Sequence, residues 1–83
     1  MTSQRSKQLL LKTLGQRIKN LRKEKKMSQY VVAKKCNMDF GSYSNIENGK
    51  RNVTVFTLQR IIKVLKVPFR ELFNFRRFLY KSI

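Results

Sequence analysis

Residues Ser28 to Arg51, SQYVVAKKCNMDFGSYSNIENGKR, decide the fold of this chain. The segment is typical of two short helices joined by a tight turn. Ser28 is a suitable N-cap for the first helix, because its hydroxyl can accept a hydrogen bond from a free amide of the first turn. That helix is expected to end near Cys36, since Asn37 tolerates the left-handed conformation that often follows a helix. Its inward residues are expected to be Val31, Val32 and Ala33.

The second helix of this segment is expected to begin after Asp39, its predicted N-cap. It should end at Asn48-Gly49, because glycine adopts the left-handed conformation at no steric cost. Tyr43 and Ile46 are three residues apart, which places them on one face of a helix, and we expect this face to point inward.

A longer helix is predicted upstream, from about Gln8. Its apolar residues recur at helical spacing, and they are Leu10, Leu11, Leu14, Ile18 and Leu21. Gly15 lies within this helix and is expected to cost roughly 0.5–1 kcal/mol of stability relative to alanine. It could also mark the start of the packed helix, with Gln8–Leu14 as a looser extension. Residues 1–7 are polar and basic, and terminal residues of this kind are usually mobile.

Two further helices are predicted downstream. Thr54 should cap the fourth, whose apolar residues are Val55, Leu58, Ile61, Ile62 and Leu65. Pro68 requires an extended residue before it and fits the first turn of a fifth helix, with Phe69, Leu72 and Phe73 as its apolar side. We therefore predict an all-α fold, a compact domain of five helices over residues 8–73, followed by a basic aromatic tail over residues 74–83.

The charge of the chain points to a polyanionic partner. Its 83 residues include 20 Lys and Arg but only 4 Asp and Glu, which gives a net charge of +16. A charge of this size opposes compaction and attracts polyanions. The apolar content of 41% is nevertheless sufficient for a small core, so a wholly disordered polycation is not expected.

Several classes of protein are excluded by the residue inventory. One cysteine, Cys36, allows no internal disulfide, and because the chain has no histidine we expect no zinc site. The four acidic residues form no close pair, so we expect neither an enzyme nor a bound cofactor or metal. No apolar run approaches the ~20 residues of a membrane span. We expect a soluble, cytoplasmic protein.

A set of residues spread over the deciding segment resembles the lambda-repressor-like helix-turn-helix family, of the Cro/CI or Xre type. They are Ser28-Gln29, Ala33, Asn37, Tyr43 and the run Ile46-Glu47-Asn48-Gly49-Lys50-Arg51. The resemblance extends upstream through Arg17-Ile18 and Leu21-Arg22, and downstream through Thr57-Leu58 and Glu71-Leu72-Phe73. Small basic controllers of restriction–modification genes are similar in size, and so are phage repressors, antitoxins and mobile-element regulators.

The resemblance implies a DNA-binding regulator of transcription that recognises specific sequences. The two short helices of Ser28–Arg51 would form the helix-turn-helix. The second of them, over about 39–48, would be the recognition helix in the major groove of double-stranded DNA. This chain departs from the family pattern at three places. Val31 stands where the family usually has an acid, Asn37 replaces the customary turn glycine, and Phe40-Gly41 replaces a polar pair.

Four residues are expected on the outward face of the recognition helix, where base edges would be contacted: Phe40, Gly41, Ser44 and Asn45. Asn45 can pair with adenine through two hydrogen bonds, and Ser44 can bond several bases. Phe40 could pack on a thymine methyl group or lie back on the preceding helix. Gly41 is either required for a close approach of the backbone or merely tolerated. Asp39 is interpreted as a cap, because phosphates would repel its carboxylate.

Five residues are expected to bind DNA phosphates: Gln29, Asn48, Lys50, Arg51 and Asn52. Gln29 lies at the start of a helix, whose free amides favour anions. Lys50 and Arg51 directly follow the recognition helix, and such contacts make affinity fall steeply with salt. Arg22 and Glu47 resemble the ion pair of the family, which we expect to be partly buried and to have a structural role.

The regulator is expected to act as a homodimer on a pseudo-palindromic operator, because one short helix contacts few base pairs. The predicted dimer interface contains Phe69, Phe73, Phe75 and Phe78. An alternative function is a protein-binding module of the antitoxin or coactivator type, which would use the aromatic tail. A third alternative is non-specific binding to polyanions or membrane surfaces, driven by charge alone.

Overall fold

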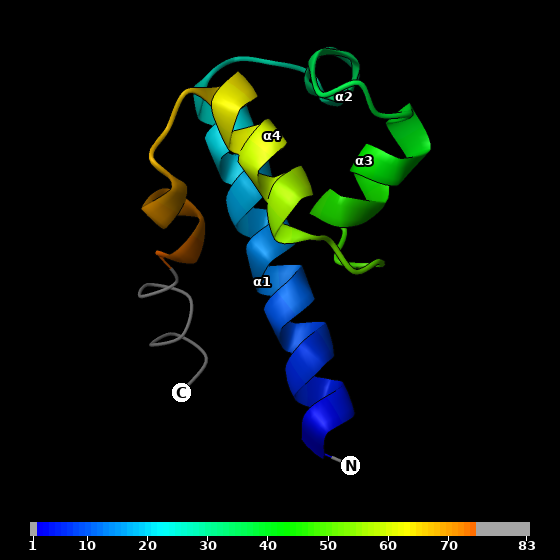
Figure 1. The fold of residues 1–83 in the computed structure, drawn as a ribbon. Helices are drawn as coiled ribbons and strands as arrows, with labels where there is room; N and C mark the ends of the chain where they lie inside the picture. Colours follow the sequence, from blue (N-terminus) through cyan, green and yellow to red (C-terminus); the bar gives the residue numbers. More distant parts are fainter. Residues whose placement is uncertain (1, 75–83) are drawn as a thin grey trace.

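The computed structural model describes residues 2–74, which form four α-helices and one short 3-10 helix (Figure 1). In chain order they are α1 (Thr2–Glu24), α2 (Gln29–Lys35), α3 (Phe40–Glu47), α4 (Val55–Leu65) and η1 (Phe69–Phe73). No strand occurs in these residues, so the all-α prediction is confirmed for this part of the chain. None of the helices described is long and apolar enough to cross a membrane.

The fifth element is a correction to the predicted count of five helices. Residues Phe69–Phe73 form a 3-10 helix of five residues instead of an α-helix. The left-handed conformation of Lys66 and the extended conformation of Pro68 leave only a short segment before Asn74. Short segments of this length are where the 3-10 geometry is commonly found.

Helix α1 begins earlier than the sequence suggested, at Thr2 instead of near Gln8. Its N-terminal turns project past the other helices (Figure 1). Leu10, expected on the inner face, is therefore 53% exposed, because the part of α1 that packs against the rest of the domain starts further along the chain. Arg5, Lys7, Gln8 and Leu9 have high helix propensity, which favours a helix here without much tertiary contact. The predicted bounds of the domain, residues 8–73, stay a prediction.

Three predicted N-caps are confirmed. The side chains of Ser28, Asp39 and Thr54 each accept a hydrogen bond from an amide three residues later. The distances to the amide nitrogens of Val31, Ser42 and Thr57 are 3.1, 2.9 and 3.1 Å. Each bond satisfies an amide that has no partner within its own helix.

The predicted turns are also present. Asn37 is left-handed, with φ of 57°, and closes the turn between α2 and α3. Gly49 is left-handed as well, with φ of 69°, and ends α3. Two residues that had not been singled out, Lys26 and Lys66, adopt the same conformation after α1 and α4.

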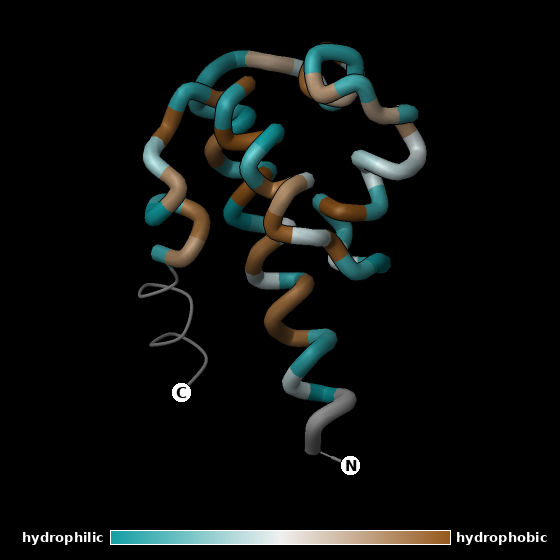
Figure 2. Tube along the Cα trace, in the orientation of Figure 1, coloured by the Kyte–Doolittle hydropathy of each residue, from teal (hydrophilic) through white to brown (hydrophobic). Residues whose placement is uncertain are grey.

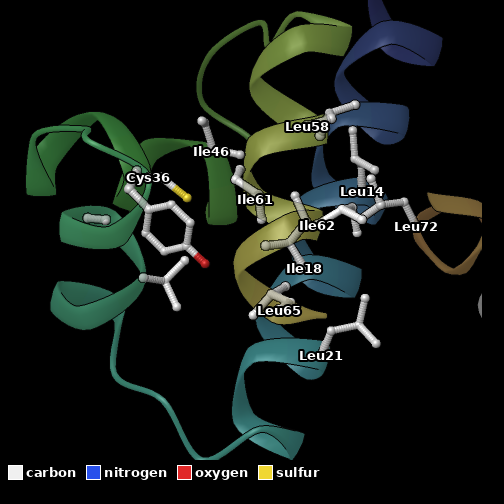
Figure 3. Packing of buried hydrophobic residues seen from close by; sticks show 13 residues of the cluster. Leu14, Ile18, Leu21, Cys36, Ile46, Leu58, Ile61, Ile62, Leu65 and Leu72 are labelled. Atoms are coloured by element: carbon white, nitrogen blue, oxygen red, sulfur yellow. The ribbon is translucent and has the colours of Figure 1, made fainter. Parts of the chain in front are cut away.

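The core lies between α1, α4 and the pair α2–α3, and η1 closes one side (Figure 3). Its fully buried members include Ile18, Tyr43, Ile61 and Leu72, one from each side. Figure 2 shows hydrophobic segments in α1 and α4 and a hydrophilic loop between α3 and α4. Cys36 is buried within this core and forms no disulfide.

Two valines predicted to face inward are exposed, which corrects that prediction. Val31 is 38% exposed because Val32 and Ala33 occupy the inner face of the short helix α2. Val55 is 66% exposed because it lies in the first turn of α4, one turn before the buried Leu58.

Candidate DNA interface

The two helices of the helix-turn-helix are held together by a buried polar network around Glu47, the last residue of α3. Arg22 of α1 donates two hydrogen bonds to its carboxylate, Nε to Oε2 at 2.7 Å and Nη2 to Oε1 at 3.2 Å. Gln29 of α2 donates its amide to Oε1 at 2.8 Å, and the hydroxyl of Tyr43 donates to Oε2. Three helices therefore meet at one carboxylate.

The network is more buried than the partly buried ion pair that the sequence suggested. Arg22 is 8% exposed and Glu47 is 4% exposed. Burial tends to raise the pKa of Glu47, but the hydrogen bonds from Arg22, Tyr43 and Gln29 outweigh it and lower this pKa below its ordinary value. Burial, together with the hydrogen bond to Glu47, raises the pKa of Tyr43. Glu47 is therefore ionised and Tyr43 is neutral at physiological pH.

Gln29, predicted to bind phosphate, lies at the N-terminus of α2 and is partly buried. Its side-chain amide is engaged with Glu47 rather than fully open to solvent. A primary amide has two N–H groups, so one remains for a phosphate. The sequence did not link Gln29 or Tyr43 to the Arg22–Glu47 pair, although the spacing of Tyr43 and Glu47, four residues apart on one helix, is a usable signal.

The residues predicted to contact bases lie on the outer face of α3. Phe40, Gly41 and Asn45 are exposed and Ser44 is partly exposed. A Cβ atom added to Gly41 would meet only the carboxylate of Asp39, at 3.9 Å. The protein itself therefore has no steric need for glycine at this position.

Phe40 is half exposed and also borders the junction of the two helices. Its side chain is 49% exposed. It lines a pocket of about 270 Å³ together with Tyr30 and Lys34 of α2 and Met38 of the turn. The position allows both arrangements considered from the sequence, contact with a base and contact with α2.

Asp39 acts as the cap of α3. Hydrogen bonds from Ser42 lower the pKa of its carboxyl group, and the positive charge of Arg51 lowers this pKa further. Arg51 itself is exposed in the loop that follows α3.

The residues predicted to bind phosphate after α3 form an exposed loop, with Asn48, Lys50, Arg51 and Asn52 all exposed. Gly49 packs so tightly against α1 that a Cβ atom there would lie 2.7 Å from the Cα of Lys12. A pocket of about 500 Å³ opens between this loop and α1. It is lined by Lys7, Gln8, Leu11, Lys12, Gly49, Lys50, Arg51 and Asn52.

Lys7 and Lys12 were not predicted as part of the interface. The signal that could have located them is Gly15, since glycine inside a helix often marks a close approach of another backbone. A Cβ atom at Gly15 would lie 2.4 Å from the carbonyl oxygens of Ile46 and Glu47. The end of α3 therefore rests on α1 at Gly15. The turn of α1 that precedes Gly15, which contains Lys12, faces the loop after α3.

Two of the four residues predicted for a dimer interface lie in η1. Phe69 is 36% exposed and Phe73 is 49% exposed, and their ring centroids are 5.5 Å apart. Phe75 and Phe78 lie outside the described residues, as does nearly all of the tail considered for a protein partner.

An ion pair that the sequence did not predict fastens η1 to α1. The guanidinium group of Arg17 donates to the backbone oxygen and to Oε1 of Glu71, both at 2.7 Å. Leu72 lies in the core beneath them. The half-exposed rings of η1 are therefore presented from a docked segment.

No group of acidic residues, cysteine or histidine within residues 2–74 is arranged to hold a metal ion. The interface described above consists of amides, hydroxyls, cations and one aromatic ring. These are the groups that bind nucleic acids through phosphates and base edges.

The comparison with known proteins agrees with this geometry. Residues 18–72 match the family described as Helix-turn-helix. The chain is 44% identical over 61 residues to the control protein C.MunI of a Mycoplasma species, covering 72% of this chain and 82% of that protein. It is 36% identical over 62 residues to the control protein C.BamHI of Bacillus amyloliquefaciens, covering 74% of this chain and 76% of that protein.

Solved structures of two restriction–modification controller proteins resemble the fold of this chain. The restriction–modification controller protein C.AhdI from Aeromonas hydrophila superposes with a TM-score of 0.72 at 32% identity, over 75% of this chain and 94% of that chain. The controller protein C.Esp1396I superposes with a TM-score of 0.70 at 39% identity, over 76% of this chain and 85% of that chain.

Proposed function

Because this chain belongs to the helix-turn-helix family, we propose that it is a transcriptional regulator that binds specific double-stranded DNA as a homodimer. The observation that carries the proposal is the outer face of α3, where Phe40, Gly41 and Asn45 are exposed next to a basic loop. Helix α3 would lie in the major groove. The loop residues would bind the flanking phosphates.

The proposal about which genes this chain regulates rests on its similarity to known proteins. Two of them are control proteins and two are restriction–modification controllers, and this chain matches three quarters or more of each of those proteins. We infer that this chain controls genes of a restriction–modification system. An immunity repressor of Bacillus phage phi105 is also 36% identical, but the match covers only 38% of that protein.

A dimer is proposed from the size of α3 and the surface of η1. Helix α3 has eight residues, so one copy can contact only a few base pairs. Two copies related by a two-fold axis would double these contacts and require a pseudo-palindromic operator. Phe69 and Phe73 present half-exposed rings that a second copy would cover. Exposed apolar groups of this kind are common in subunit interfaces.

A selection from randomised duplexes at physiological salt tests the proposal. The expected result is a recovered palindrome whose half-sites are about one helical turn, or a multiple of it, apart. Its position next to restriction–modification genes in the source genome would support the assignment of the regulated genes. Recovery of no preferred sequence would contradict the proposed sequence-specific DNA binding. Sedimentation as a monomer at micromolar concentration would contradict the proposed homodimer.

Replacing Asn45 by alanine is expected to change which operators are selected. The variant should lose about 1–3 kcal/mol of discrimination at the base pair that Asn45 contacts. Lys50→Ala is the matched control, since it should weaken binding to all duplexes alike. Titrations against the operator and its single-base variants measure both effects. If both variants lose affinity uniformly, the assignment of Asn45 to base recognition is wrong.

A further inference from the structure

The first turns of α1 lie outside the region that defines the family in this chain. The family match begins at residue 18, whereas α1 begins at Thr2. Figure 1 shows these turns projecting past the rest of the domain, and the loop that joins α3 and α4 lies next to the part of α1 that follows them. A helix that projects without a core beneath it adds little to stability. Core packing therefore does not account for the position of this part of α1 near the proposed interface.

The contact between α1 and this loop is close and specific. Gly49 adopts φ of 69°, and any side chain there would overlap the backbone of Lys12. The loop consequently runs directly against α1, and the pocket of about 500 Å³ forms between them. Leu11 supplies an apolar part of its wall.

The pocket concentrates positive charge. Lys7 and Lys12 line it from α1, and Lys50 and Arg51 line it from the loop, while no acidic residue is among its lining residues. Like charges gathered in this way repel one another and create a positive potential. An anion bound between them would relieve the repulsion. The pocket is open, and three of the residues proposed to bind phosphate line it, namely Lys50, Arg51 and Asn52.

We propose that this pocket binds the phosphate backbone of duplex DNA just outside the operator half-site, through Lys7 and Lys12. The inference rests on the proposed DNA-binding function and extends its contact surface to α1. Lysine suits this role, because its ammonium group binds phosphate as a point charge and needs no contact with a nucleobase. Leu11 would lie against the adjoining sugar. The contact adds affinity without adding sequence preference.

The experiment uses the full chain and the operator recovered by selection, in two lengths. One duplex carries about one extra helical turn of unrelated sequence on each side, and the other ends at the edge of the operator. The wild-type protein should bind the longer duplex more tightly. This arm involves no substitution, so it is independent of any effect on folding.

The second arm compares Lys7→Ala/Lys12→Ala with a control of equal charge, Lys23→Ala/Lys63→Ala. All four lysines are exposed, and Lys23 lies about 24 Å from Lys7 along α1. Each phosphate contact adds about 0.9 to the slope of log affinity against log salt. Losing two contacts should therefore reduce the drop in affinity between 50 and 200 mM salt by roughly ten-fold. The control should resemble the wild type.

The outcomes separate this inference from the proposed function. Selective binding by the wild type, with equal affinity for both duplexes and equal salt slopes for both variants, would overturn the role of the pocket and leave the proposed function intact. Failure of the wild type to bind any selected duplex would overturn the proposed function itself. Loss of the length dependence in Lys7→Ala/Lys12→Ala alone supports the inference.

Discussion

Replacing Glu47 by alanine is expected to lower the free energy of unfolding by about 3–5 kcal/mol. The substitution leaves the guanidinium group of Arg22 and the hydroxyl of Tyr43 buried without their shared acceptor. An uncompensated buried charge is among the most destabilising changes a protein can undergo. Urea unfolding followed by circular dichroism measures the effect. A domain of this size has a total stability of only about 5–15 kcal/mol.

The double variant Arg22→Met/Glu47→Leu is the matched control for this prediction. It removes both charges and keeps similar volume, so no buried charge is left unpaired. We expect it to be more stable than Glu47→Ala, although Tyr43 and Gln29 still lose an acceptor. A loss below about 1 kcal/mol for Glu47→Ala would mean that the pair behaves like a surface ion pair.

Replacing Gly15 by alanine is expected to destabilise the domain by about 1–3 kcal/mol or more. Helix propensity alone predicts the opposite, a gain of about 0.5–1 kcal/mol. The added Cβ atom would lie 2.4 Å from the carbonyl oxygens of Ile46 and Glu47, which are backbone atoms at the end of α3. Helices α1 and α3 would have to separate, which also strains the network of Glu47. Thermal and urea unfolding measure the change.

Gly41→Ala provides the internal comparison, because Gly41 is also a helical glycine. Its added Cβ atom meets only the side chain of Asp39 at 3.9 Å. The substitution should therefore raise the unfolding free energy by about 0.5–1 kcal/mol, as propensity predicts. Equal effects at Gly15 and Gly41 would show that the close approach of α1 and α3 is not a constraint.

The comparison of these two glycines illustrates how far the sequence could predict this protein. The sequence indicates for Gly15 a propensity cost or the start of the packed helix, and for Gly41 either a close approach or mere tolerance. The contact of Gly15 with α3 joins residues about thirty positions apart, which no local pattern encodes. The burial of the Arg22–Glu47 pair and the inclusion of Gln29 in its network depend on the same packing.

The caps at Ser28, Asp39 and Thr54, the left-handed turn at Asn37 and the inward face of Tyr43 and Ile46 were determined by the sequence itself. Each depends on residues within one turn of the chain, so the local order of side chains is sufficient. Only the tertiary structure decided that α1 passes beside the loop after α3, and that Lys7 and Lys12 line the same pocket as Lys50. These groups meet because α3 rests on α1 at Gly15, and such a contact exists only when distant segments pack together.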